Sequence, residues 1–467
     1  MIVKNIKSNK IASEARLNSG YFLNEDAINS SILEQNINNC DALSDLADVW
    51  NPPIFKRQFS QKTDKSTQYC QSSDVPNSFE GNDVYINKNQ ADKVNALVKE
   101  NQILITGFGT IGNTRIVNKI SDGICYANNV CRVDVRDKGQ YGYVYAVLTS
   151  KYGYSQLNKN ASGSVVRYIE APGIKKTLIP KFDENFRNRI HNLIIESTNL
   201  KVESNLILDS ALKDLKSNVG LKELDPIDYE YFGNHSENRQ TSTFIKSIND
   251  ISNLSINAFN YSEKIEKLSS EVKQNKYLSL GDCLDKNQFF STGSFRRLEI
   301  QSKKAIKLLN QSDIFNFRKV GKNLSRRYVK SDRLVEYGEV LIAGVGTLGE
   351  GETFCRTIFA NEELANQLVA GEFIRMKTNE KTPSGYLFCW LSSDYGFRLI
   401  RSTQTGTKLC RPIQEFLKDI PVPILEKSIM DRIDSKVKKA HSMLYQALLK
   451  ENQAIDLVEK EIEEWEK

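Results

Sequence analysis

Residues 97–112 of the chain read LVKENQILITGFGTIG, and residues 334–349 read LVEYGEVLIAGVGTLG. The two stretches share their apolar pattern and all three glycines, at an offset of 334 − 97 = 237 residues. A likeness of this length within one sequence indicates an internal repeat, and a repeat bears on the whole architecture.

Further matches between the two halves follow the same order along the chain, at offsets of 237 to 243 residues. They are residues 55–57 with 295–297, residues 142–153 with 385–396, and Ile179-Pro180 with Ile420-Pro421. Since the order holds throughout, we predict one domain that occurs twice.

The hydrophobic period becomes helical after each Ile-Pro pair. From Asp183 to Asn218, and again from Glu426 to Trp465, apolar residues recur at spacings of three, four and seven. This pattern is typical of a long amphipathic helix, and 36 residues would span roughly 54 Å. Because two equal apolar stripes can cover each other, we expect the helices to pair as an antiparallel coiled coil.

The stretches before each Ile-Pro pair favour strands. Residues 103–106 and 340–343 are short apolar runs closed by glycine, whereas residues 143–148 and 386–391 fit either a strand or a short buried helix. We therefore predict an α+β protein with two duplicated mixed α/β domains, each followed by a long helix. The predicted boundaries are 1–180 for the first domain, 181–219 for its helix, 220–243 for a linker, 244–421 for the second domain and 422–467 for the last helix.

Composition excludes several classes of protein. With 467 residues, 40% hydrophobic and 26% charged, the chain is globular, and no apolar run approaches the length of a membrane span. The N-terminal residues lack the apolar segment of a secretory signal. The eight cysteines contain no Cys-x-x-Cys pair and the three histidines lie far apart, so we expect reduced thiols, no metal site and a cytoplasmic location.

Two motifs suggest chemistry that their surroundings do not support. Gly107-Phe-Gly-Thr-Ile-Gly112 has the spacing of a dinucleotide-binding loop, but Thr114–Val117 follows as a strand where that site needs a helix. For this stretch and for its repeat Gly344–Gly349, a tight turn that requires positive φ fits better, and a turn whose amides approach phosphate is a further alternative. Asn51-Pro-Pro-Ile54 is similar to the Asn-Pro-Pro-aromatic motif of amino-methyltransferases, but a turn-forming Pro-Pro is the simpler interpretation.

Basic residues flanked by aromatic ones are more informative. Lys56-Arg57 follows Phe55, Arg296-Arg297 follows Phe295, and Arg326-Arg327 precedes Tyr328. The net charge is only +6, which is compatible with nucleic acid without indicating it. Two basic pairs at equivalent places in both copies, however, indicate a duplicated ligand, and arginine can contact phosphate or read guanine.

The order of these motifs, found twice, resembles the specificity subunit of type I restriction–modification systems. In each half a Phe-Lys/Arg-Arg loop precedes the glycine turn, a Gly-Tyr segment ending in Ser-x-Tyr-Gly follows it, and a long helix comes after Ile-Pro. Residues 447–459, ALLKENQAIDLVE, also resemble the family. The resemblance covers most of the chain.

This resemblance implies a phage-defence protein that reads DNA without catalysing a reaction. Each half would be a target-recognition domain for one half of a bipartite double-stranded DNA target. The helices would dock two DNA-methyltransferase subunits, and a restriction–translocase subunit would join them. S-adenosylmethionine would bind to the methyltransferase, so this chain would need no cofactor, metal or catalytic residue.

The expected contact residues are drawn from the motifs above. Those expected to contact DNA are Phe55, Lys56, Arg57, Thr110, Arg115, Ser162 and Ser164 in the first half, and Phe295, Arg296, Arg297, Thr347, Thr405, Thr407 and Lys408 in the second. Those expected on the partner-binding helices are Ile190, Leu193, Leu200, Val437, Leu444 and Val458. Two alternatives stay open: a permuted adenine-N6 methyltransferase centred on Asn51–Phe55, and a scaffold that binds no DNA.

Overall fold

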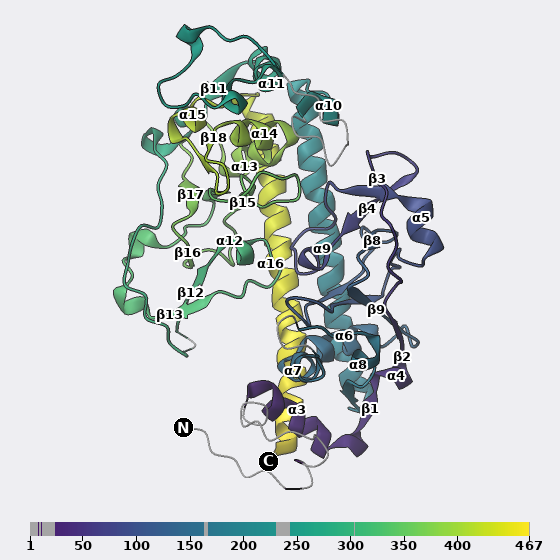
Figure 1. The fold of residues 1–467 in the computed structure, drawn as a ribbon. Helices are drawn as coiled ribbons and strands as arrows, with labels where there is room; N and C mark the ends of the chain where they lie inside the picture. Colours follow the sequence, from purple (N-terminus) through teal and green to yellow (C-terminus); the bar gives the residue numbers. More distant parts are fainter. Residues whose placement is uncertain are drawn as a thin grey trace. The chain divides into compact units, whose positions relative to one another are not determined.

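The computed structural model describes residues 8, 11, 24–162, 167–229, 243–302 and 304–466. The chain forms two compact units, one of residues 1–202 with 446–467 and the other of residues 203–445. Each unit contains one repeated domain and part of both long helices (Figure 1). Because the division runs through those helices, the domain boundaries predicted above stay a prediction. Ser164 and residues 230–242 of the predicted linker lie outside the described residues.

A four-stranded antiparallel sheet forms the centre of the first unit, in the order β2-β9-β6-β7. The strands are β2 (Ala47–Trp50), β9 (Val130–Val135), β6 (Ile103–Thr106) and β7 (Thr114–Ile116). All four residues of β6 are buried, which explains why this segment of the repeat is continuously apolar.

A second, smaller sheet of the first unit has the order β3-β5-β4-β8. Its strands are β3 (Phe59–Ser60), β5 (Tyr85–Asn87), β4 (Ser66–Cys70) and β8 (Cys125–Tyr126). Strands β4 and β8 pair in parallel, whereas the other pairs are antiparallel. The long connection from β4 to β8 passes through the central sheet, so the two sheets form one domain.

The second unit repeats this arrangement with one strand fewer in each sheet. Its central sheet has the order β15-β14-β17 and its smaller sheet the order β13-β12-β16, in which β12 and β16 pair in parallel as β4 and β8 do. The strands are β14 (Val340–Ala343), β15 (Thr357–Phe359), β17 (Phe373–Met376), β12 (Ile306–Leu309), β13 (Lys322–Leu324) and β16 (Leu368–Val369). The predicted duplication is confirmed by this shared topology.

The ambiguous Gly-Tyr segments are helices. They form α6 (Tyr141–Thr149) and α13 (Ser384–Ser392), and a second short helix follows each, α7 (Lys151–Lys159) and α14 (Asp394–Ser402). Seven or eight residues of α6 and of α13 are buried, so no polar face marks their helical period. Burial on all sides is what made the sequence pattern ambiguous.

The glycine of each Ser-x-Tyr-Gly motif permits the sharp turn between the paired helices. Ser150 and Ser393 cap the second helices by accepting from the amides of Gly153 and Gly396. A Cβ atom on Gly153 would lie 2.1 Å from the carbonyl oxygen of Val147, and the second copy is equally tight. Only glycine fits at this position in either copy.

Two-stranded ribbons connect each domain to its neighbouring helices. Strand β1 (Cys40–Ala42) pairs with β10 (Leu178–Pro180), and β11 (Tyr277–Ser279) pairs with β20 (Pro421–Pro423). The remaining helices are α3 (Glu25–Gln35), α4 (Leu43–Leu46), α5 (Lys88–Lys93), α8 (Ala171–Ile174), α10 (Pro226–Tyr229), α11 (Glu263–Lys273), α12 (Gln311–Ile314) and α15 (Gln414–Lys418), and β18 (Gln404–Thr405) pairs with β19 (Arg411–Pro412).

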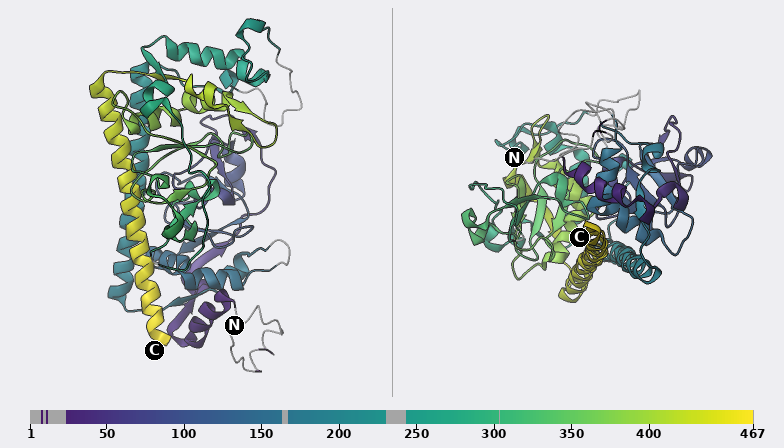
Figure 2. Two further views of the ribbon diagram at one scale, coloured as in Figure 1. Left: turned by 90° about the vertical axis from the view of Figure 1, so that its left-hand side faces the viewer. Right: turned by 90° about the horizontal axis from the view of Figure 1, so that it is seen from below.

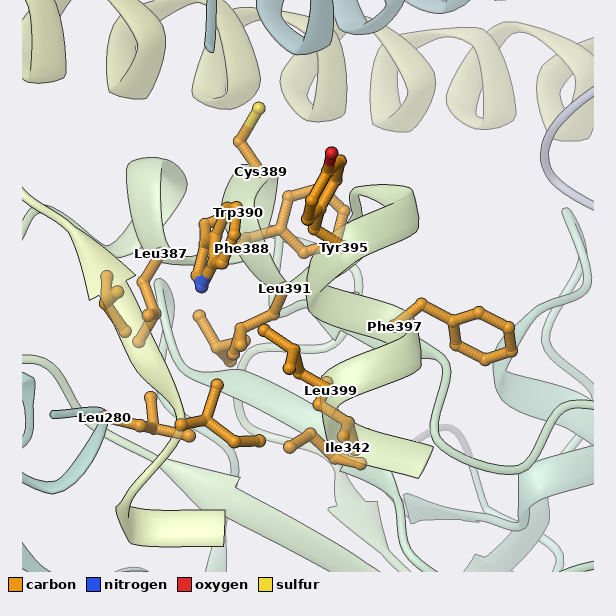
Figure 3. Close-up of a cluster of buried hydrophobic side chains, with 14 of the residues drawn as sticks. Leu280, Ile342, Leu387, Phe388, Cys389, Trp390, Leu391, Tyr395, Phe397 and Leu399 are labelled. Atoms are coloured by element: carbon orange, nitrogen blue, oxygen red, sulfur yellow. The ribbon is translucent and has the colours of Figure 1, made fainter. Parts of the chain in front are cut away.

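The core of the second unit lies between its sheet and its helices. Trp390, Phe388 and Leu387 of α13 pack with Ile342 of β14 in one cluster of buried side chains (Figure 3). Cys389 points the other way, toward the long helices that cross the top of this view. The helix α13 is thus covered on one side by the sheet and on the other by the long helices, which explains its uniform hydrophobicity.

The two long helices are α9 (Glu184–Val219) and α16 (Lys427–Glu463), and they lie side by side in opposite directions (Figures 1 and 2). In the first unit the Ser197 hydroxyl donates to the carbonyl oxygen of Ala447 at 2.8 Å, and in the second unit Ser204 donates to that of Ala440 at 2.8 Å. A short serine side chain reaches a neighbouring backbone only if the helices approach closely. The predicted antiparallel pairing is confirmed. No helix in the described part of the chain is long and apolar enough to cross a lipid bilayer.

Small residues at every seventh position form the contact line between these helices. On α9 they follow Ile190 as Ser197, Ser204 and Ala211, all buried. On α16 the buried alanines are Ala440, Ala447 and Ala454. The two serines of this stripe are thus residues that permit close approach.

A buried carboxylate joins three helices of the first unit. Glu451 of α16, whose side chain is 2% exposed, accepts from the Lys201 ammonium at 2.7 Å and from the Tyr145 hydroxyl at 2.8 Å. Ser197 also donates to it at 3.3 Å. A buried charge that is paired and hydrogen-bonded in this way is tolerated, and it favours one register of the helix pair.

We expect His441 to make the stability of the second unit depend on pH. It lies on α16 between the rings of Phe359 and Phe388, at 5.0 and 5.1 Å, and burial lowers its pKa to about 3. Since the unfolded chain has a histidine pKa near 6.5, its stabilising contribution is complete above pH 6.5 and is lost as the pH falls toward 3. We expect wild type to lose about 1.4 kcal/mol more than His441→Leu between pH 7.5 and 5.5, measured by urea unfolding. An equal loss in both proteins would show that His441 does not titrate on unfolding.

Candidate nucleic-acid interface

Several loops of the first unit emerge from the same edge of the central sheet. Because its strands are antiparallel, the ends of β2 at Trp50 and of β6 at Thr106 lie beside the starts of β9 and β7. Residues 51–58, 107–113 and 127–129 therefore leave the sheet together. We call these three segments the loop edge of the first unit.

Asn51 connects the loop edge internally. Its Nδ2 donates to the carbonyl oxygen of Asn128 at 3.0 Å, and its Oδ1 accepts from the amide of Ala171 at 2.9 Å. Both ends of the side chain are therefore occupied by backbone. This favours the structural interpretation of the Asn-Pro-Pro motif, since a methyltransferase would need that amide for its substrate.

The glycine turn of the first unit has the expected backbone. Gly109 and Gly112 have φ values of +73° and +87°, and the Thr106 hydroxyl closes the turn by donating to the carbonyl oxygen of Thr110 at 2.6 Å. The side chain of Thr110 is exposed. Strand β7 follows the turn, so the helix that a dinucleotide site requires is missing here.

The matching turn of the second unit has a different backbone. None of Gly344, Gly346 and Gly349 has a positive φ. Cys355, which follows the turn, has a φ of +68°. Our expectation of positive φ in both copies is therefore wrong for the second. Gly346 is required there for another reason: a Cβ atom would lie 2.9 Å from that of Phe354. Thr347 is exposed, as Thr110 is.

The basic loop of the first unit is anchored by an aromatic residue. Phe55 is half-buried against a cluster that includes Tyr69 and Ile86, whereas Lys56 and Arg57 are exposed. The Arg57 guanidinium donates to the Tyr69 hydroxyl at 2.7 Å and lies 5.3 Å from the centre of that ring. The loop thus presents two cations at the surface.

The second unit presents its basic loop in the same manner. Phe295 is half-buried against a cluster that includes Ile306 and Leu308, and Arg296 and Arg297 are exposed. The Arg296 guanidinium lies 4.8 Å from the centre of the Tyr328 ring. Equivalent residues of the repeat therefore have equivalent exposure in both units.

Arg115 occupies an internal position. Its side chain is 10% exposed, and its guanidinium contacts Glu80 at 2.6 Å and the carbonyl oxygens of Val75 and Asn77 at 3.0 and 2.7 Å. The neighbouring carboxylate raises its pKa above the ordinary value, against the effect of burial. This placement does not support the predicted DNA contact, because the donors of Arg115 are already used.

The remaining predicted residues that the structure describes lie at the surface. Ser162 pairs with Tyr168 in an isolated bridge and is exposed, and Ser164 lies outside the described residues. In the second unit, Thr405, Thr407 and Lys408 are exposed around the turn between β18 and β19. Each of these segments pairs with the glycine turn of its own unit, through Phe108 with Tyr168 and Gly346 with Cys410.

The residues predicted to dock partner subunits lie mostly inside the units. Ile190, Val437, Leu444 and Val458 are buried, and Leu193 and Leu200 are half-buried. The four buried residues stabilise the chain itself, so the structure does not support a direct partner contact through them. A partner that docks on α9 or α16 has to contact their exposed faces.

Sequence reasoning missed two aromatic contacts at this surface. Phe108, the second residue of the glycine turn, stacks on Tyr168 with ring centres 5.5 Å apart. Arg333 lies 5.8 Å from the Phe295 ring. An aromatic residue inside a Gly-x-Gly turn was a possible signal for the first, but nothing local indicated the second, since 38 residues separate Arg333 from Phe295.

The described residues contain no group of three or more histidine, cysteine or carboxylate side chains placed to hold a metal ion. All eight cysteines are buried and unpaired. Burial raises the pKa of Cys131 to about 12, so this thiol is not a reactive one.

Comparisons with known proteins find similarity in structure only. No family model matches the sequence, and no curated protein matches it. A type I restriction–modification S subunit from M. genitalium aligns over 91% of this chain and 92% of its own at 14% identity and a TM-score of 0.29. The HsdS subunit from Thermoanaerobacter tengcongensis aligns over 90% and 95% at 10% identity and a TM-score of 0.27. A chain from a type I R-M system studied for complex assembly aligns over 89% and 97% at 12% identity and a TM-score of 0.25.

Proposed function

We propose that the chain is a non-catalytic DNA-specificity subunit of a type I restriction–modification complex. The observation that carries this proposal is the duplicated domain with an equivalent basic loop in each copy. Phe55 and Phe295 anchor the loops, and Lys56-Arg57 and Arg296-Arg297 are exposed at the same place of the fold. Two diverged copies of one binding surface suit an asymmetric target read in two halves.

The exposed side chains of these surfaces suit DNA. Arginine and lysine bind phosphate, and arginine also reads guanine in the major groove. The exposed hydroxyl groups of Thr110 and Thr347 lie on turns that can approach the backbone of a duplex. We assign phosphate contacts to these threonines and base contacts to the arginine loops.

Catalysis and cofactor binding are assigned to partners. The proposed partners are two DNA-methyltransferase subunits, which would bind S-adenosylmethionine, and a restriction–translocase subunit. They would dock on the exposed faces of α9 and α16, because the inner faces are used in the helix pair. Eight buried unpaired thiols support a reducing, cytoplasmic location.

Substitutions in the two arginine loops should affect DNA recognition independently of each other. The complex reconstituted with methyltransferase subunits would be titrated with duplexes whose target is randomised in one half at a time. We expect Arg57→Ala to relax recognition in one half and Arg296→Ala in the other, each by about 1–3 kcal/mol, because each domain contacts its own bases.

Lys159→Ala is a suitable control, because its ammonium is mostly buried and bound to Glu34. If both arginine variants altered the same half, the one-domain, one-half model would be wrong. Absence of salt-dependent binding to duplex DNA would favour a scaffold instead. Methyl transfer to DNA by the isolated chain would overturn the non-catalytic assignment.

A further inference from the structure

Four arginines lie close to two aromatic rings beside the smaller sheet of the second unit, and a fifth arginine is their neighbour in the chain. Arg296 and Arg327 lie 4.8 and 5.9 Å from the centre of the Tyr328 ring. Arg297 and Arg333 lie 5.6 and 5.8 Å from the Phe295 ring. The fifth is Arg326, next to Arg327 in the short helix of residues Arg326–Tyr328. We call these seven residues the arginine–aromatic cluster.

The cluster is held by backbone pairing. The amide of Ser325 donates to the carbonyl oxygen of Leu298 at 2.8 Å, and the amide of Ile300 donates to that of Asn323 at 3.0 Å. The segment after Arg297 therefore lies along β13 as an added strand. This places Arg296 and Tyr328 beside each other although 32 residues separate them.

No carboxylate of the described residues pairs with the exposed arginines of the cluster. Among the described residues, none lies within ion-pair distance of the guanidinium groups of Arg296, Arg297, Arg326 or Arg327, whereas Arg115, Arg375 and Arg401 each contact a glutamate. The nearby Glu299 is paired with Lys322 at 2.7 Å. The exposed arginines are thus available to an external acceptor.

Stacking on an aromatic ring orients a guanidinium without using its N–H donors. The Cζ atom of Arg296 lies 4.8 Å from the centre of the Tyr328 ring, and no described residue accepts a hydrogen bond from its guanidinium, so this planar set of donors is available to the O6 and N7 acceptors of guanine. The first unit differs, because Arg57 donates one N–H to the Tyr69 hydroxyl and its neighbour is a lysine. Lysine binds as a point charge and lacks this planar fork.

We propose that Arg296, positioned by Tyr328, reads a guanine in the half of the target that the second unit contacts. This inference rests on the proposed DNA-specificity function. Arg296 donates two hydrogen bonds to O6 and N7 of one guanine. Arg326 and Arg327, exposed beside it, contact the phosphates that flank this base.

The test uses the reconstituted complex with a target selected from randomised duplexes. Each guanine of the target is then replaced in turn by 7-deazaguanine, which pairs normally with cytosine but lacks N7. We expect one guanine in the second half to lose roughly 5- to 150-fold in affinity on this replacement. In the Arg296→Ala variant, which has no donor to place at N7, the same replacement should have no further effect.

Two more variants separate base reading from charge. Tyr328→Leu should reduce discrimination between guanine and adenine at that position while the dependence of binding on salt stays unchanged. Arg57→Lys serves as the matched control, because it should not alter that position. Melting temperatures of the arginine variants should equal that of wild type, since these side chains are exposed, and binding of the variant of the half-buried Tyr328 is measured well below its own melting temperature.

The outcomes distinguish this inference from the function on which it rests. If the complex selects a target but no guanine of the second half responds to 7-deazaguanine, the guanine assignment is wrong and the specificity function stands. If Arg296→Ala weakens all sequences equally and lowers the salt slope by about one, Arg296 binds phosphate and the inference fails. If no target is selected at all, the proposed function itself fails.

Discussion

Replacing Leu444 with aspartate is expected to lower the free energy of unfolding by about 4 kcal/mol. Leu444 is 6% exposed and lies on the inner face of α16, in the part of the helix that belongs to the second unit. The substitution removes a buried apolar side chain and leaves a charge with no partner provided for it. Both effects act in the same direction, so the loss exceeds that of Leu444→Ala.

Urea unfolding of Leu444→Asp beside Gln446→Asp would measure this effect. Gln446 is exposed two residues further along the same helix, so its aspartate variant adds the same charge without burying it. We expect the Leu444 variant alone to lose stability and to stop co-purifying with methyltransferase subunits. Unchanged unfolding and unchanged co-purification would argue against the packing of α9 with α16.

Replacing Arg115 with alanine is expected to destabilise the first unit by about 3–5 kcal/mol. The substitution leaves the carboxylate of Glu80, whose side chain is 2% exposed, without its guanidinium partner. It also removes the donors to the carbonyl oxygens of Val75 and Asn77. A buried unpaired charge is strongly unfavourable, whereas the exposed Arg57 has no such role.

The matched comparison is Arg115→Ala with Arg57→Ala. We expect the first to lower the melting temperature and to leave the sequence preference of the folded protein intact, and the second to do the reverse. The double variant Arg115→Met/Glu80→Leu should recover much of the lost stability, because no buried charge is then left unpaired. An Arg115→Ala protein that melts like wild type but reads DNA differently would restore the original prediction of a DNA contact.

Equivalent positions of the repeat bury arginine in different ways. Arg375 of β17 contacts Glu339 at 2.8 Å, and both side chains are 1% exposed. Its counterpart, at 375 − 243 = 132, is Arg132, which donates instead to the carbonyl oxygens of Ala96, Ala127, Val130 and Tyr126. Without a carboxylate beside it, burial lowers the pKa of Arg132 to about 10. Both copies thus have a buried arginine at this position, but the groups that accept its hydrogen bonds differ.

The residue that accepts a hydrogen bond at the start of α6 or α13 also differs between the two copies. The amide of Gly142 donates to His191 Nδ1 at 3.2 Å, and the amide of Gly385 donates to Asp434 at 2.8 Å. Gly142 and Gly385 are 243 residues apart, and so are His191 and Asp434. A histidine and an aspartate therefore accept from the same place at the start of α6 and α13. The glycine at the start of this helix is the same in both copies, whereas the residue that accepts from its amide differs.

The sequence alone determined the duplication, the long helices and the basic loops, because each is a pattern of residue types at short or repeated spacing. A period of three and four identifies α9 and α16 wherever they pack, and two aligned motifs identify a repeat without reference to space. The exposure of Lys56-Arg57 and Arg296-Arg297 also followed, since charged pairs in loops are seldom buried.

Only the tertiary structure decided which polar side chains form hydrogen bonds inside the protein and which aromatic residues contact distant side chains. Arg115 and Arg57 are the same residue type, so the type alone does not tell which one is buried. Arg115 is buried because it pairs with the carboxylate of Glu80, 35 residues away in the chain. The sequence of residues 143–148 fits a strand or a helix until burial on all sides is known. Tyr328 meets Arg296 because β13 pairs with a distant segment. Burial and pairing depend on residues far apart in the chain, and local patterns carry no information about them.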